Sequence, residues 1–234
     1  AAMKSTEKMT LEDADATILS LVVLTTQKLE ETIQDVPIPV SAFDPVALER
    51  PNFDTGPDLQ FKFPKFGPTP GNFSTGGISI AGFKNAAVGA SSDAAVGTHT
   101  NGVSSSGSTL LETEFYDVER IEILRGPQGT LYGRNATGGV VNAITAKPVL
   151  EEFNASAELT YGEFNNQKLT GHINVPLGER LAARVAGTYL KRDGYSDAIL
   201  PDGSTQDVDG RHLWAIRGTL SGAITHKLSF WLIG

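Results

Sequence analysis

The sequence contains no cysteine and only four histidines, and these shortages restrict the chemistry that the chain can carry. Without cysteine, the chain has neither disulfide bonds nor thiolate metal ligands. The histidines are scattered, and none of them occurs in HExxH or a similar metal-ligand spacing. We therefore predict no metal site and no bound cofactor.

Positive charge and long apolar runs are scarce as well. The 19 lysines and arginines are outnumbered by 27 aspartates and glutamates, which gives a net charge of −8 at pH 7. No basic patch stands out, so we expect no nucleic-acid partner. The apolar run at 18–24 is far shorter than the roughly 20 residues that a transmembrane helix needs.

Glycine is abundant, with 25 residues, and it is concentrated between positions 126 and 139. Such a segment could cradle a phosphate or form tight turns. A P-loop requires GxxxxGK followed by Ser or Thr, which occurs nowhere in the chain, and the glycine spacing does not give GxGxxG. We therefore predict no enzyme activity and interpret the segment as two turns between strands at 119–124 and 140–145. The turn residues are Gly126, Pro127, Gly129, Gly133, Gly138 and Gly139.

Residues 151–234 show a period of two that is typical of antiparallel strands with one apolar and one polar face. The pattern predicts strands at 153–161, 169–177, 181–189 and 212–224, a fifth from 227, and a long polar, poorly ordered loop at 191–211. By pattern alone, both an outer-membrane barrel and a soluble β-sandwich remain open. Because the smallest barrels have about 8 strands, the barrel interpretation makes this chain a fragment.

The stretch VERIEILRGPQGTLYGRNATGGVVNAITAKP at 118–148 resembles the end of the plug domain of TonB-dependent outer-membrane receptors. Three further stretches resemble plug segments of the same family: LVVLTTQKLEETIQDVPIPVSAF at 21–43, GGISIAGF at 76–83 and VGTHTNGV at 96–103. The chain departs from the family at Ala81, where an arginine is usual. The resemblance covers residues from about 18 to the end of the chain.

The resemblance implies a mainly β protein with a small α+β part. We expect a globular plug domain followed by the first antiparallel strands of a transmembrane β-barrel, truncated so that the barrel does not close. The expected divisions are a disordered N-terminal segment at 1–17, the plug with its TonB box at 18–150, and four to five barrel strands at 151–234.

The resemblance also implies a function. Members of the family take up scarce nutrients, most commonly ferric siderophores, by energy-coupled displacement of the plug. The implied partners are TonB, the nutrient ligand and outer-membrane lipid, and the implied location is the outer membrane of a Gram-negative bacterium with the plug facing the periplasm. The alternatives are a soluble plug-like module for binding or signalling, and a non-functional fragment without transport.

Three groups of site residues follow from the resemblance. The first is the TonB box, an extended β-branched segment near the terminus that suits strand addition; its residues are Leu21, Val22, Val23, Leu24, Thr25 and Thr26. The second group would anchor the plug to barrel glutamates beyond Gly234, and its residues are Arg125, Glu119 and Arg120. As an alternative to this anchoring, Glu119, Arg120 and Glu122 are close enough to form a local network. The third would contact ligand from apical loops, and it consists of Phe83, Asn85, Phe115 and Tyr116.

Overall fold

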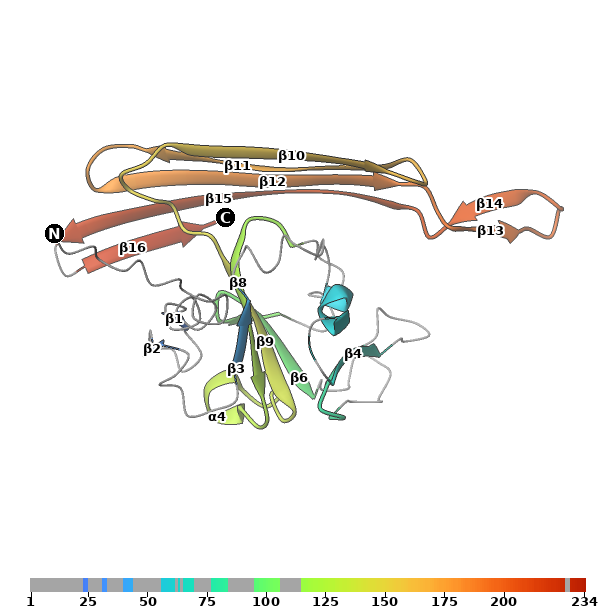
Figure 1. The fold of residues 1–234 in the computed structure, drawn as a ribbon, viewed down its shortest axis with the longest axis horizontal. Coiled ribbons are helices and arrows are strands. Elements are labelled where there is room, and N and C mark those ends of the chain that lie inside the picture. Colours follow the sequence, from blue (N-terminus) through green and yellow to red (C-terminus); the bar gives the residue numbers. More distant parts are fainter. Residues whose placement is uncertain are drawn as a thin grey trace, which may run out of the picture. The chain divides into compact units, whose positions relative to one another are not determined.

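The computed structural model describes residues 23–24, 31–32, 40–43, 56–61, 63, 65–69, 77–83, 95–105, 115–225 and 228–234 (Figure 1). The chain divides into two compact units. The first unit comprises residues 1–113 and 119–144, and the second comprises residues 114–118 and 145–234. The segment 1–17, which we expected to be disordered, lies outside the described residues.

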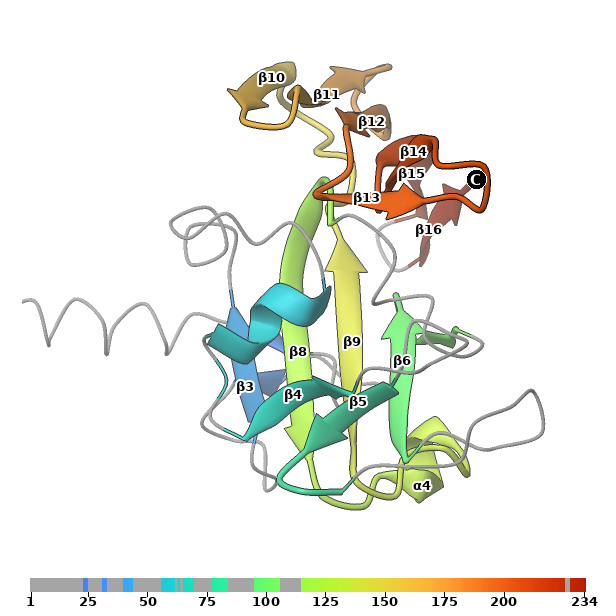
Figure 2. The same cartoon turned by 90° about the vertical axis from the view of Figure 1, so that its right-hand side faces the viewer.

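The first unit is built on a five-stranded sheet with the order β3-β8-β9-β6-β7 (Figure 2). Strands β8 and β9 run in opposite directions. Strand β3 is antiparallel to β8, whereas β6 is parallel to β9. The strands predicted at 119–124 and 140–145 are confirmed, with slightly wider bounds. The five strands are β3 Val40–Phe43, β6 Val96–Thr100, β7 Val103–Ser104, β8 Val118–Arg125 and β9 Gly139–Thr145.

Shorter elements flank this sheet. Strand β1 pairs with β2, and β4 pairs with β5. A single helical turn, α4, lies between β8 and β9, where the sequence suggested only turns. Their bounds are β1 Val23–Leu24, β2 Glu31–Thr32, η1 Gly56–Phe61, β4 Phe66–Thr69, β5 Gly77–Ile80 and α4 Gly129–Tyr132. No helix in the described part of the chain is long and apolar enough to span a membrane.

The core of the first unit lies along β8 and β9. Every residue of β9 is buried, as are residues 120–124 of β8, so both strands are covered on both faces. Leu124 and Val140 form a cluster with Tyr132 of α4 and Ala136, and Val40 of β3 packs against it. Since a fully buried aliphatic side chain contributes about 1.5–3 kcal/mol, this cluster holds α4 and the turns around it onto the strand pair.

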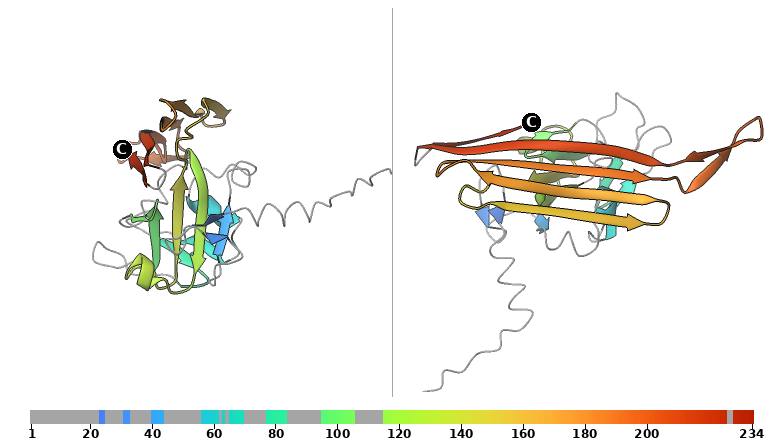
Figure 3. Two further views of the ribbon diagram at one scale, coloured as in Figure 1. Left: turned by 90° about the vertical axis from the view of Figure 1, so that its left-hand side faces the viewer. Right: turned by 90° about the horizontal axis from the view of Figure 1, so that it is seen from above.

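The second unit is an antiparallel sheet in which each strand pairs with the next, in the order β10-β11-β12-β15-β16 (Figure 3). Strands β10 and β16 lie at its two edges, so the sheet is open. The five strands predicted from the alternating pattern are confirmed. They are β10 Asn154–Gly162, β11 Asn166–Pro176, β12 Leu181–Arg192, β15 Arg211–Thr225 and β16 Leu228–Ile233.

The prediction of a poorly ordered loop at 191–211 is wrong. Strand β12 continues to Arg192, and the residues beyond it form a hairpin of β13 Ser196–Ile199 and β14 Thr205–Val208. The hairpin closes through a tight turn in which Leu200 N–H donates to Ser204 O at 2.8 Å and Gly203 has a φ of 81°. Hydrogen bonds from the hydroxyl and the backbone N–H of Ser204 lower the pKa of Asp202 in this turn. The prediction treated the whole polar segment as a loop and missed the turn signal Pro-Asp-Gly at 201–203.

Candidate functional site

The structure describes two of the six residues of the predicted TonB box. Val23 and Leu24 form β1, and they pair in antiparallel register with Thr32 and Glu31. The remaining predicted residues, Leu21, Val22, Thr25 and Thr26, lie outside the described part of the chain. The backbone at positions 23–24 is therefore extended, as strand addition requires, and it is paired with β2; recognition by TonB stays a prediction.

The glycine-rich segment forms a compact connection between β8 and β9. Gly126 N–H donates to Gly138 O at 3.2 Å, and Gln128 N–H donates to Ala136 O at 2.7 Å. Gly126 and Gly133 have φ values of 88° and 86°, a backbone region that favours glycine. These backbone groups satisfy one another, so the segment works as a structural turn, as predicted.

A buried polar network lies at the centre of the first sheet. Arg120 Nε donates to Glu122 Oε1 at 2.9 Å, and Asn142 Nδ2 donates to Glu122 Oε2 at 3.3 Å. The Asn142 amide oxygen accepts from Gly102 N–H at 3.0 Å, and Arg120 also contacts Glu119. Because Glu122 is fully buried, these partners offset the cost of removing its charge from water. This is the local network that we considered for Glu119 and Arg120, and their anchoring role stays a prediction.

Two further residues of the first unit are Tyr132 of α4 and Arg125 of β8. Burial, with a contribution from the Glu122 charge, raises the pKa of Tyr132 to about 12. The Tyr132 ring meets the His99 ring edge-on, with 5.0 Å between centroids. Arg125, predicted to be an anchor, has an exposed side chain whose Nη2 donates to Ser41 Oγ at 2.8 Å, which links β8 to β3. Its pairing with barrel glutamates stays a prediction.

The predicted ligand contacts are distributed over both units. Phe83 belongs to the first unit and is 59% exposed, in the turn that follows β5. Phe115 and Tyr116 belong to the second unit and are half-buried, and the Arg217 guanidinium lies 4.8 Å from the centre of the Tyr116 ring. Asn85 lies outside the described residues. Ligand binding by these residues stays a prediction.

The sequence analysis missed a charged cluster around Asp117 in the second unit. Arg184 of β12 reaches both carboxylate oxygens from Nε, at 2.9 and 3.1 Å, and makes a further contact through Nη2. Arg217 of β15 donates from Nη2 to the carboxylate at 3.0 Å and to Asp117 O at 2.8 Å. His172 Nδ1 lies 3.7 Å from the same carboxylate. The alternation placed both arginines on the polar face, yet nothing in the sequence paired them with Asp117.

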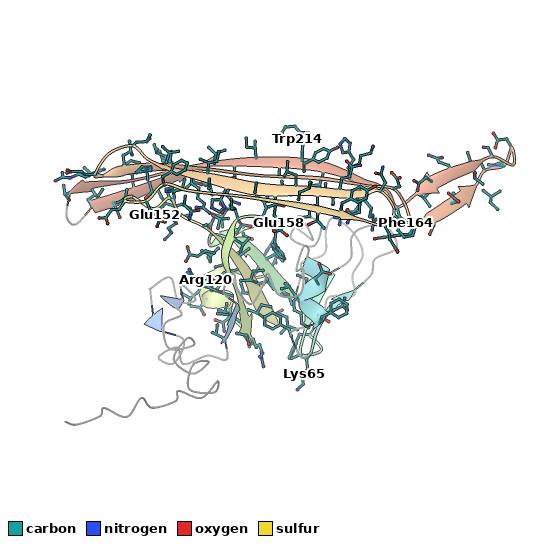
Figure 4. The ribbon with its side chains drawn as sticks, turned by 45° about the horizontal axis from the view of Figure 1, so that its top comes forward. Lys65, Arg120, Glu152, Glu158, Phe164 and Trp214 are labelled. Carbon is teal, nitrogen blue, oxygen red and sulfur yellow. The ribbon has the colours of Figure 1, made fainter. Side chains whose placement is uncertain are left out.

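The opposite face of this sheet is apolar and exposed. Leu159, Leu169, Tyr189 and Trp214 lie in one cross-strand row, and their exposed fractions are 75, 48, 37 and 73%. Glu158, one residue along β10, projects from the other face (Figure 4). A row of large apolar side chains with no covering layer among the described residues marks a contact surface.

Comparison with known proteins identifies the family. Residues 32–140 match the model of the TonB-dependent Receptor Plug Domain. The chain carries the plug domain of a TonB-dependent receptor. The metal-pseudopaline receptor CntO of Pseudomonas aeruginosa is 44% identical over 62 residues, which cover 26% of this chain and 9% of that protein. This family consists of receptors and transporters rather than enzymes.

Solved structures of TonB-dependent receptors share the fold. The ferric yersiniabactin uptake receptor FyuA from Yersinia pestis matches with a TM-score of 0.65 and 23% identity, over 80% of this chain and 29% of that one. Pseudomonas aeruginosa FpvA, in a complex with a heterologous pyoverdine, matches with a TM-score of 0.73 and 17% identity, over 89% and 26%. The chain thus spans less than a third of the length of either solved relative. Its first unit carries the plug sheet, and its second sheet supplies the first barrel strands, as predicted.

Proposed function

We propose that the chain is part of a TonB-dependent receptor that takes up a ferric siderophore through the outer membrane, by energy-coupled displacement of the plug. The observation that carries this proposal is a plug domain continuous in sequence with a sheet whose apolar face is exposed. The plug would face the periplasm, where TonB acts. FyuA and FpvA, whose names refer to ferric yersiniabactin and pyoverdine, support the siderophore as the ligand class.

Strand lengths support contact with outer-membrane lipid. Strands β11, β12 and β15 have 11, 12 and 15 residues, and a tilted strand crosses a bilayer with roughly 9–11 residues. The exposed row from Leu159 to Trp214 ends in Tyr189 and Trp214. Aromatic rings of this kind form girdles at the lipid–water boundary of outer-membrane barrels. The exposed apolar face would therefore be covered by lipid.

The pairing of β1 supports TonB as the partner. Strand β1 has two residues and pairs with a strand of equal length. Few main-chain hydrogen bonds must break to release it, and an extended segment can then add to a sheet edge of another protein. Main-chain hydrogen bonds would supply most of the affinity, so the backbone N–H at position 24 matters more than the side chain.

Binding to the periplasmic domain of TonB tests this coupling role. The 234-residue chain in detergent is titrated with that domain, together with the Leu24→Pro and Leu24→Ala variants. Proline removes the backbone N–H and blocks strand addition, so we expect Leu24→Pro to weaken binding by about tenfold or more, and Leu24→Ala by less than about threefold. Equal binding by the proline variant and the unchanged chain would refute strand addition at β1.

The ligand class is tested with a ferric catecholate, a ferric hydroxamate and cobalamin. Quenching of tryptophan fluorescence reports binding, because the chain contains Trp214 and Trp231. We expect saturable quenching by one ferric siderophore, weaker quenching by its iron-free form, and none by cobalamin. Saturable binding of cobalamin alone would overturn the siderophore proposal and leave the TonB result unaffected.

A further inference from the structure

We propose that Asn101 is a modification site, at which spontaneous deamidation converts the side-chain amide to a carboxylate when the turn between β6 and β7 opens. Asn101 is followed by Gly102, and no other asparagine in the sequence is followed by glycine. Because glycine has no side chain, its backbone nitrogen can approach the Asn101 amide without a steric obstacle. In the unfolded chain, Asn101 is therefore the asparagine most exposed to this reaction.

The reaction needs only these two residues and water. The Gly102 backbone nitrogen loses its proton and attacks Asn101 Cγ, which closes a succinimide ring. The bond from Cγ to the side-chain nitrogen breaks, and that nitrogen takes up a proton and leaves as ammonia. Water then opens the ring at one of its two carbonyl groups and gives either aspartate or isoaspartate, whose backbone runs through the side chain. Neither step oxidises or reduces the chain.

The folded first unit holds the attacking nitrogen in a hydrogen bond. Gly102 N–H donates to Asn142 Oδ1 at 3.0 Å, and Asn142 is 1% exposed. The nitrogen must give up this bond as well as its proton before it can attack Asn101 Cγ. Asn142 is itself fixed, because its Nδ2 donates to Glu122 Oε2 at 3.3 Å and Glu122 is fully buried. The side chain of Asn142 therefore guards the modification site.

The turn that carries the site can open without loss of the whole sheet. Asn101 and Gly102 link β6 to β7, and their φ values of 53° and 76° are typical of a type I′ turn. Asn101 N–H donates to Ala143 O at 2.9 Å, which extends the pairing of β6 with β9. Strand β7 has only two residues and lies at the edge of the sheet. Few hydrogen bonds must therefore break to release the turn while β8 and β9 stay in place.

Deamidation would change both the charge and the backbone of this turn. Aspartate adds a negative charge beside the hydrogen bonds that lead through Asn142 to the buried Glu122 carboxylate. Isoaspartate adds a carbon atom to the backbone of a two-residue turn, so Thr100 and Val103 could no longer keep their register. Refolding does not reverse either product. The modified fraction would therefore record how long the turn has been open.

Incubation of the 234-residue chain in mildly alkaline buffer tests the proposal, once folded in detergent and once unfolded in urea. Peptide mapping by mass spectrometry measures the deamidated fraction at Asn101, and methyl transfer by an isoaspartyl methyltransferase measures isoaspartate. We expect the folded chain to react at least about tenfold more slowly than the unfolded chain. Asn142→Ala removes the acceptor of the Gly102 N–H, so it should speed the folded reaction by about fivefold and leave the reaction in urea unchanged.

A matched variant of β9 separates the guarding bond from general loss of stability. Val140 is fully buried on the same strand as Asn142, and Val140→Ala weakens the packing of the sheet but keeps the acceptor. It should change the rate at Asn101 by less than about twofold. If Asn142→Ala does not fold, the folded and unfolded forms of the unchanged chain still give the comparison. Absence of deamidation at Asn101 in urea, equal rates in the two forms, or equal acceleration by the two variants would overturn the proposal.

Discussion

Replacement of Gly139 by alanine should disrupt the plug sheet, although the change adds a single methyl group. Gly139 begins β9 with a φ of 151°, a backbone conformation that other residues rarely adopt. A Cβ at this position would lie 2.5 Å from Leu124 O and 3.0 Å from Ile80 Cδ1. Leu124 is fully buried and paired with Val40, so its carbonyl cannot retreat.

The magnitude follows from two additive terms. Overpacking in a well-packed core costs about 1–3 kcal/mol, and an unfavourable backbone conformation costs of order 1–3 kcal/mol. We therefore expect Gly139→Ala to lower the free energy of opening of the plug sheet by about 3 kcal/mol. Since roughly 1.4 kcal/mol corresponds to a factor of ten, exchange of the buried β8 and β9 amides should accelerate about a hundredfold.

Gly129 provides the matched control for this experiment. It is the first residue of α4, its φ is not in the positive range, and a Cβ there meets no atom within 4 Å. Gly129→Ala should therefore be neutral, or stabilising by up to about 1 kcal/mol. Hydrogen–deuterium exchange followed by mass spectrometry measures both variants in the same peptides. Exchange of 139–145 in Gly139→Ala within threefold of that in Gly129→Ala would show that the close approach to Leu124 is not a constraint.

Two further predictions concern the first unit. Burial raises the pKa of Tyr132 to about 12, so its contribution to the free energy of unfolding is complete below pH 10 and declines as the pH rises toward 12. Urea titrations at alkaline pH should show a loss of up to about 2 kcal/mol in the free energy of unfolding, and Tyr132→Phe should lack this loss. The same pH dependence in both proteins would contradict the prediction. Ala81 has a φ of 52° in the exposed turn after β5. Ala81→Gly should therefore stabilise the β4–β5 pair by about 0.5–1 kcal/mol, and exchange there faster than in the unchanged chain would contradict the strain argument.

Local patterns were enough to predict much of the fold. The alternation at 153–161 and the following segments predicted β10, β11, β12, β15 and β16, because side chains on a strand alternate between two faces. The glycine and proline at 126–127 predicted the turn after β8, because its φ values favour glycine. These features depend on a few neighbouring residues, so the sequence alone carries them.

Features that depend on distant residues could not be predicted in the same way. Asp117 and its partners Arg184 and Arg217 are separated by 67 and 100 positions, and no spacing rule connects them. The network of Glu122 with Asn142 likewise needs the pairing of two strands. Even the double glycine at 138–139 does not reveal which atoms approach each residue, whereas the structure places the Leu124 carbonyl oxygen beside Gly139 and Phe83 Cβ beside Gly138.

The two sheets also show why alternation does not reveal which face is buried. In β8, residues 120–124 are buried on both faces, so Glu122 lies in the core although its charge suggests the surface. In β10–β16 the alternation is clear, yet the exposed face is the apolar one that carries Leu159 and Trp214, while Arg184 and Thr188 of the polar face are buried. A soluble sandwich would bury the apolar face. An exposed apolar face is expected of a sheet that faces lipid. The period of two does not show which face is buried. Burial in the structure does show it, and it favours the barrel interpretation over the sandwich.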